Sequence, residues 1–204
     1  MAYSNDGKPA RDFSKDLWWS MGKGATGVED ILRDPINFPG LLRIEKTHET
    51  DDRNGVDYWV HLLNGDRIGV DNKARTPDWA ERGRDDLTLE ILSDIERQTP
   101  GCTRDVSKHC DYINFFWPTT GRWCLLPFRP LLSIFLQHWQ EWEQVYKCNT
   151  ETTRAGMRSW RSKCVFVPRR LVIDLIEAQY GGVPALLKKP PMRIINPSQT
   201  DLPF

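Results

Sequence analysis

Residues 54–75 read NGVDYWVHLLNGDRIGVDNKAR, and the pattern of this stretch decides the fold. Apolar and polar residues alternate on both sides of a central LNG, which is typical of a β-hairpin with one face in the core. Matching the apolar faces selects a three-residue loop at 63–65, with Gly65 in the left-handed conformation. In that register Tyr58 lies opposite Val70, so apolar residues pair with apolar residues.

The same register places two carboxylates on the polar face, which we expect to be exposed. Asp57 falls opposite Asp71, and Lys73 lies one pleat beyond Asp71 on that face. Directly opposed residues have Cβ atoms about 4.5–5.5 Å apart, so both carboxylates can bind one divalent cation. Two like charges that face each other destabilise a hairpin, which favours a bound cation over a solvated cluster of salt bridges.

This arrangement resembles the PD-(D/E)XK nuclease superfamily. The resemblance rests on GVD at 55–57, on DNK at 71–73 one hairpin later and on Glu29 in the preceding helix. It implies a Mg²⁺-dependent nuclease, with Mn²⁺ as a substitute cation, that hydrolyses phosphodiester bonds with a lysine-assisted water. The roles that it implies are metal ligation by Asp57, Asp71 and Glu29, and assistance of the attacking water by Lys73.

The identity of the third metal ligand stays open at the level of sequence. Two carboxylates alone bind Mg²⁺ weakly, so a third acid is expected. Glu29 has the position that the resemblance implies, whereas Glu45 and Glu49 lie nearer to the hairpin along the chain. A zinc site around Cys102 and Cys110 is disfavoured, because no C-x-x-C pair is present.

The charge distribution is compatible with a polyanionic substrate. The formal net charge is zero, but residues 147–204 hold ten Lys and Arg against four Asp and Glu, which leaves the first 146 residues acidic. An acidic half that binds metal, joined to a basic half, suits an enzyme that acts on a polyanion, and uneven surface charge without a functional role is the alternative. With the nuclease resemblance, the expected partner is nucleic acid, with DNA favoured. The basic residues expected to contact nucleic acid are Arg67, Arg75, Arg154, Arg158, Arg161, Lys163, Arg169 and Arg170.

Location and partners are predicted from what the sequence lacks. No segment has the roughly 20 apolar residues that span a bilayer, and the N-terminus is not that of a signal peptide, so we expect a cytoplasmic protein without a membrane partner. Five irregularly spaced cysteines fit reduced thiols. A homodimer stays open, as do DNA against RNA, single against double strands, and endonuclease against exonuclease.

The length of 204 residues suits one domain. We expect an arm at 1–13, an α/β domain at 14–183 and a proline-rich tail at 184–204. The domain should contain a mixed central sheet flanked by helices, in the αβββαβ order of the suspected family, with helical additions toward the C-terminus. The expected helices are 14–33, 87–95, 128–146 and 169–179, and the expected strands are 41–46, the two of the hairpin, 112–117, 122–126 and an edge strand at 164–167.

A second class of function is compatible with the same residues. A module that keeps the nuclease fold but only binds nucleic acid, or another protein, would use the basic segment 154–170 with its interleaved Trp160 and Phe166. Metal-dependent cleavage separates the two classes. Other enzyme classes are disfavoured, because no P-loop, dinucleotide-binding, nucleophile-elbow or H-E-x-x-H motif is present.

Overall fold

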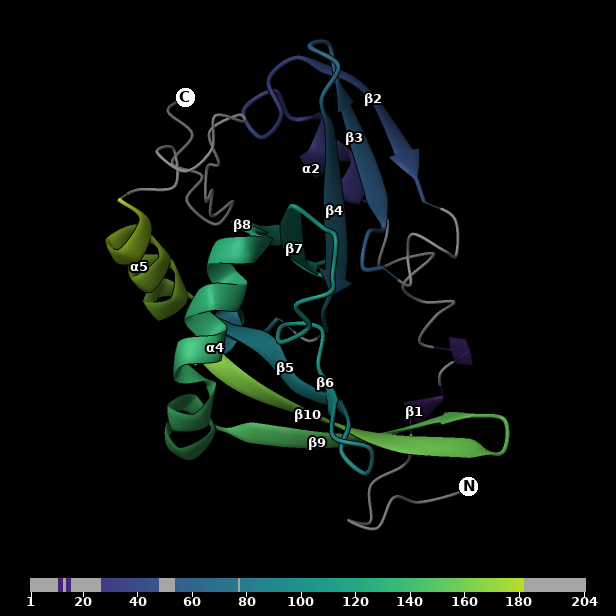
Figure 1. The fold of residues 1–204 in the computed structure, drawn as a ribbon, viewed down its shortest axis with the longest axis vertical. Coiled ribbons are helices and arrows are strands. Elements are labelled where there is room, and N and C mark those ends of the chain that lie inside the picture. Colours follow the sequence, from purple (N-terminus) through teal and green to yellow (C-terminus); the bar gives the residue numbers. More distant parts are fainter. Residues whose placement is uncertain (1–10, 13, 16–26, 48–53, 77, 182–204) are drawn as a thin grey trace.

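A computed structural model describes residues 11–12, 14–15, 27–47, 54–76 and 78–181 (Figure 1). The chain forms an α/β fold with two five-stranded sheets, as the sequence predicts in class. The first sheet has the order β2-β3-β4-β7-β8, with β2 Leu41–Lys46, β3 Tyr58–Leu62, β4 Arg67–Ala74, β7 Tyr112–Trp117 and β8 Arg122–Pro127. The second has the order β1-β9-β10-β5-β6, with β1 Arg11–Asp12, β5 Asp86–Asp94, β6 Thr99–Pro100, β9 Cys148–Ala155 and β10 Arg158–Pro168.

The hairpin of β3 and β4 has the predicted register. Tyr58 pairs with Val70, and Gly65 closes the turn with φ 88°. The Leu62 N–H donates to the Asp66 carbonyl at 2.9 Å, which leaves a loop of three residues between them. Both predictions for the turn are therefore confirmed.

The first sheet is mixed, with antiparallel strands and one parallel pair. Strands β2, β3 and β4 form an antiparallel meander, β7 lies parallel to β4, and β8 pairs antiparallel with β7. A parallel neighbour requires a crossover connection, and the crossover from β4 to β7 carries the 3₁₀ helix η1 (Trp79–Arg82) and strands β5 and β6. The second sheet is thus built partly inside the connection between two strands of the first.

The predicted helix at 87–95 is wrong. This segment is strand β5, in which Leu87, Leu89 and Ile91 are buried at every second position. Apolar residues at every second position are typical of a strand with one buried face. The additional apolar residues Leu92 and Ile95 gave the segment a spacing that also fits a helix. The αβββαβ order therefore holds for the first sheet but not for its crossover.

The strand predicted at 164–167 is confirmed as part of β10, but its predicted place at a sheet edge is wrong. Strand β10 is longer than predicted and lies between β5 and β9. Strand β9 was not predicted, because its sequence CNTETTRA has no apolar alternation that marks a buried face. Pairing with β10 holds β9 in the sheet instead.

The two longest described helices lie together on one side of this framework. Helix α4 (Phe128–Val145) buries most of the predicted apolar stripe, although Leu136 and Val145 are exposed, and α5 (Arg169–Tyr180) ends at Gly181 with φ 71°. Both predicted helices are confirmed. They pack against each other and against β10, beside the first sheet in Figure 1. Buried residues of both sheets and both helices form one continuous apolar core.

The N-terminal part is described only in pieces. The predicted helix at 14–33 appears as residues 14–15 and as α2 (Val28–Arg33), and residues 16–26 lie outside the described residues. Strand β1, inside the predicted arm, pairs in parallel with β9. The predicted tail at 184–204 lies outside the described residues as well. Among the described helices, none has the length and apolar character needed to cross a bilayer.

Candidate active site and adjoining cleft

Asp71 forms the centre of the candidate site. It lies on β4, between β3 and the parallel strand β7, and is 1% exposed. The Lys73 Nζ lies 2.6 Å from its Oδ1, and the Lys108 Nζ lies 2.8 Å from its Oδ2. The expectation of an exposed carboxylate is therefore wrong. One buried carboxylate is held between two ammonium groups.

The charges of this cluster are set by mutual attraction. Burial alone would raise the pKa of Asp71, but the ammonium groups of Lys73 and Lys108 outweigh burial and lower that pKa to about 2. Burial would lower the pKa of Lys73, yet the attraction of Asp71 raises it. At neutral pH the cluster therefore contains a carboxylate and the two ammonium groups of Lys73 and Lys108, and Lys73 acts as a hydrogen-bond donor and a positive charge.

Lys108 is the residue that sequence reasoning missed. It lies in the loop before β7, 37 positions from Asp71, so no local spacing connects the two residues. The space that its side chain occupies is provided by Gly55, which has φ 79°. A Cβ atom at Gly55 would lie 2.8 Å from the Lys108 Nζ. The glycine of the GVD tripeptide was the signal in the sequence, but it did not reveal which side chain passes over it.

Asp57 lies beside this cluster, though not in the predicted pairing with Asp71. The regular ladder ends before Asp57, whose N–H donates to the Val70 carbonyl at 2.9 Å. Its Oδ2 accepts a hydrogen bond from the Asn72 N–H at 2.7 Å. The Asp57 charge also contributes to the raised pKa of Lys73. The two aspartates and Lys73 thus share one electrostatic site, with Asp57 held against the backbone of β4.

The predicted third acid does not join this pair. Glu29 lies on the exposed side of α2, where it accepts a hydrogen bond from Arg33 at 3.0 Å. Glu45 on β2 lies 3.0 Å from His61. Glu49 lies outside the described residues. Within the described part of the chain, no three His, Cys, Asp or Glu side chains gather into a metal site, and the five cysteines are free thiols.

The chemical type of the donors, carboxylate oxygens, nevertheless suits a hard divalent cation. Mg²⁺ is commonly bound by one or two carboxylates and keeps several waters, and Asp57 and Asp71 provide two carboxylates. The buried, ionised carboxylate of Asp71 already faces positive charge at both oxygens. A cation can bind Asp71 Oδ2 only if the Lys108 ammonium moves away from that oxygen.

A cleft of about 900 Å³ lies where β4 ends above the second sheet. Residues 74–76, which directly follow Lys73, form one side of it, and alternate residues of β5, β9 and β10 form its floor. Glu90 on β5 lines the cleft and also accepts a hydrogen bond from the Cys102 N–H at 2.7 Å. Cys102 interacts electrostatically with Lys73, so Glu90 and Cys102 connect the cleft to the Asp71 cluster.

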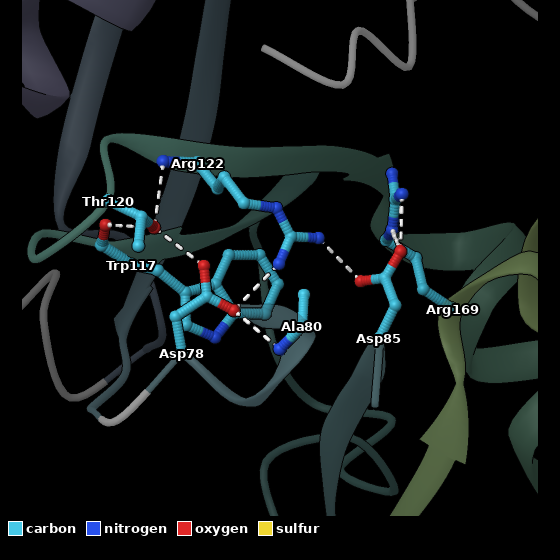
Figure 2. A network of polar contacts seen from close by, with 7 residues as sticks. All are labelled: Asp78, Ala80, Asp85, Trp117, Thr120, Arg122 and Arg169. Atoms are coloured by element: carbon cyan, nitrogen blue, oxygen red, sulfur yellow. Dashed lines mark hydrogen bonds and ion pairs between the residues drawn. The ribbon is translucent and has the colours of Figure 1, made fainter. Parts of the chain in front are cut away.

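A network of ion pairs forms one wall of the cleft (Figure 2). The buried guanidinium of Arg122 donates to Asp78 at 2.7 Å and to Asp85 at 2.6 Å, and Arg169 donates to the other oxygen of Asp85. Thr120 donates to the second oxygen of Asp78 at 2.6 Å. Arg169 was predicted to contact nucleic acid, but it is buried and structural.

The other predicted nucleic-acid contacts are distributed over several places. Arg75 lines the cleft, whereas Arg67 stacks on Trp59 with 3.5 Å between its Cζ and the ring centroid. Arg154 and Arg158 are exposed on the hairpin of β9 and β10. The remaining three form ion pairs: Arg161 with Glu96, Lys163 with Glu143, and Arg170 with Asp174. The basic segment 154–170 is therefore no single continuous surface.

Comparison with protein-family models, with curated proteins and with solved structures gave no match to this chain.

Proposed function

We propose that the protein is a metal-dependent nuclease that hydrolyses phosphodiester bonds, with DNA as the favoured substrate. The observation that carries the proposal is the cluster of Asp57, Asp71 and Lys73, which combines two carboxylates and an ammonium where the start of β3 meets β4. Asp71 stays ionised although it is buried, so its carboxylate can bind a divalent cation that displaces one of its lysine partners.

The topology of the first sheet supports the same proposal. An antiparallel meander with a fourth strand parallel to the third agrees with the βββ and final β of the suspected family's core. Of the two tripeptides that carry the resemblance, 55–57 directly precedes β3, and 71–73 lies on the adjacent strand β4. The helix expected in the crossover is replaced by strands, so the agreement concerns the first sheet.

Each residue of the cluster has a role that follows from its contacts. A divalent cation held by Asp57 and Asp71 would supply an activated water and neutralise charge on the phosphate. The Asn72 N–H fixes the Asp57 carboxylate, and Asp71 orients the Lys73 ammonium. Because Lys73 is protonated, it stabilises the developing negative charge as a hydrogen-bond donor rather than accepting a proton.

One observation favours the second class of function, a module that binds nucleic acid without cutting it. Lys108 places an ammonium on Asp71 Oδ2, where a cation-dependent enzyme needs an accessible oxygen. If this ion pair is permanent, Lys108 replaces the metal. The two functions differ in whether a divalent cation displaces Lys108.

The test combines calorimetric Mg²⁺ and Mn²⁺ titration with cleavage of circular DNA, linear DNA and RNA, with and without the metal. We expect wild type to bind the cation and to cut. Asp71→Asn, which preserves side-chain volume, should lose both properties. Lys73→Met should keep the metal and lose about 10²–10⁴-fold in rate. Circular dichroism checks that each variant is folded, and Asp174→Asn on the exposed side of α5 is the control.

The outcomes separate the two functions. A wild-type protein that binds no divalent cation and cuts no substrate, yet binds nucleic acid, would support the non-catalytic module. Full cleavage by Asp71→Asn would mean that the proposed site is not the nuclease site.

A further inference from the structure

The second sheet has two faces of different character. Val165 and Val167 of β10 are buried in the core that includes α4 and α5. The alternate residues of the same strand point the other way, and Trp160, Ser162 and Phe166 among them line the cleft. The floor of the cleft is therefore the sheet face opposite to the one that packs on α4 and α5, and it adjoins the end of β4.

The charges in the cleft favour an anionic ligand. Most acidic residues that line the cleft are paired with an arginine. Arg122 binds Asp78 and Asp85, and Arg169 also binds Asp85. Arg84 binds Asp86, and Arg11 binds Glu151. Three lining cations, Lys15, Arg75 and Lys147, have no ion pair among the described residues. The Arg75 Nε is buried without a hydrogen-bond partner there. Positive charge thus exceeds the negative charge left on Glu90.

The aromatic residues restrict the class of anion. Trp79 is 37% exposed at the rim, and Trp160 is half-buried in the floor. Aromatic platforms interleaved with cations bind single-stranded nucleic acid, because unpaired bases stack on the rings while Lys and Arg contact the phosphates. The bases of a duplex are already paired and stacked on each other, so they cannot stack on these aromatic side chains.

We propose that this cleft binds a single strand of nucleic acid and directs it to the Asp71 cluster. The proposal rests on the proposed nuclease function and specifies its substrate as single-stranded. Continuity supports it, since residues 74–76 of the cleft follow Lys73 directly, and Glu90 connects the floor to Cys102 beside that lysine. Bases would stack on Trp160 and Trp79, and Arg75 would bind the phosphate nearest to the cluster.

The test measures binding in EDTA, so that cleavage plays no part. Fluorescence anisotropy compares labelled dT₁₂, labelled rU₁₂ and a blunt DNA duplex of the same length. We expect both single strands, or one of them, to bind at least tenfold tighter than the duplex, and the comparison of dT₁₂ with rU₁₂ identifies the sugar that is preferred. Trp160→Ala should weaken single-strand binding roughly tenfold, as expected for the loss of one stacked base.

Matched variants distinguish stacking from loss of structure. Trp160→Phe keeps an aromatic face and should retain most of the affinity. Trp139→Ala removes a half-buried tryptophan of α4 that lies outside the cleft, and it should leave binding unchanged. Arg75→Ala should weaken binding and reduce its salt dependence, whereas Arg158→Ala, on the exposed end of β10, should have a smaller effect on both.

Failure of this inference can be told from failure of the nuclease proposal. Equal affinity for the duplex, or unchanged single-strand binding in both Trp160→Ala and Arg75→Ala, would overturn the cleft as the binding site even if the protein cuts DNA. Single-strand binding that depends on Trp160 and Arg75 would support the cleft even if no metal-dependent cleavage is found.

Discussion

At Asp71, one carboxylate and two ammonium groups are balanced in a buried volume. Removing the carboxylate leaves two ammonium groups without their counter-charge, and removing one ammonium leaves one Asp71 oxygen without its charged partner; both are costly in a low-dielectric environment. Lys73 is part of the D-x-K pattern, whereas Lys108 approaches from a distant loop that Arg129 holds by donating to the Lys108 carbonyl at 2.8 Å. Under the proposed function, this ammonium would have to leave Asp71 Oδ2 when a metal ion binds there.

This arrangement predicts the effect of Lys108→Met. If Lys108 competes with a divalent cation for Asp71 Oδ2, the variant should bind Mg²⁺ or Mn²⁺ about tenfold tighter or more, because the metal no longer displaces a charged hydrogen bond. In metal-free buffer the variant should lose about 1–3 kcal/mol of stability. Calorimetric titration and urea unfolding measure the two effects, with Arg170→Met as a surface control. Lower stability without any metal binding would identify the Asp71–Lys108 pair as purely structural.

At the scale of elements, residues with a local pattern were predicted and residues without one were not. The hairpin was predicted in register because its apolar faces match in only one way, and α4 because its apolar residues repeat at three and four positions. Strand β9 has no apolar face, and β5 was assigned to the wrong period. Lys108 and the cleft were not predictable from local patterns, since both depend on the long crossover from β4 to β7.

Two glycines of the hairpin region allow a test with a matched control. Gly55 and Gly65 both have positive φ, so substitution by alanine should cost each about 1–2 kcal/mol of stability. Only at Gly55 does the added Cβ meet the Lys108 side chain, whereas nothing lies within 4 Å of the Cβ at Gly65. Gly55→Ala should therefore also move the Lys108 ammonium away from Asp71 and change the metal affinity. Urea unfolding and calorimetric titration of both variants measure this, and equal metal affinities would show that Gly55 does not control the position of Lys108.

At the scale of the whole molecule, the two sheets are connected by buried charge as well as by the apolar core. Arg122 is on β8 of the first sheet, Asp85 immediately precedes β5 of the second, and Arg169 begins α5. Their ion pairs, with Asp78, join the ends of these elements at the wall of the cleft (Figure 2). These ion pairs hold one wall of the cleft in place, and under our proposal a flexible single strand would bind against that wall.

The same network predicts how stability depends on pH. Burial would raise the pKa of Asp85, but hydrogen bonds from Arg169 and Arg122 outweigh burial and lower it. A carboxylate whose pKa is lower in the folded state stabilises the protein above its unfolded pKa of about 3.9, and this contribution is lost as the pH falls below that value. Asp85→Asn should therefore reduce stability at pH 7 and weaken the loss of stability between about pH 4 and pH 3.

Urea unfolding at pH 7, 5, 4 and 3 measures this dependence. The control is Asp174→Asn, which removes an exposed carboxylate paired with Arg170 on the same helix as Arg169 and should follow the wild-type profile closely. A profile of Asp85→Asn that runs parallel to that of wild type below pH 4 would show that the Asp85 ion pairs contribute no pH-dependent stability. The connection between the two sheets would then depend on the apolar core alone.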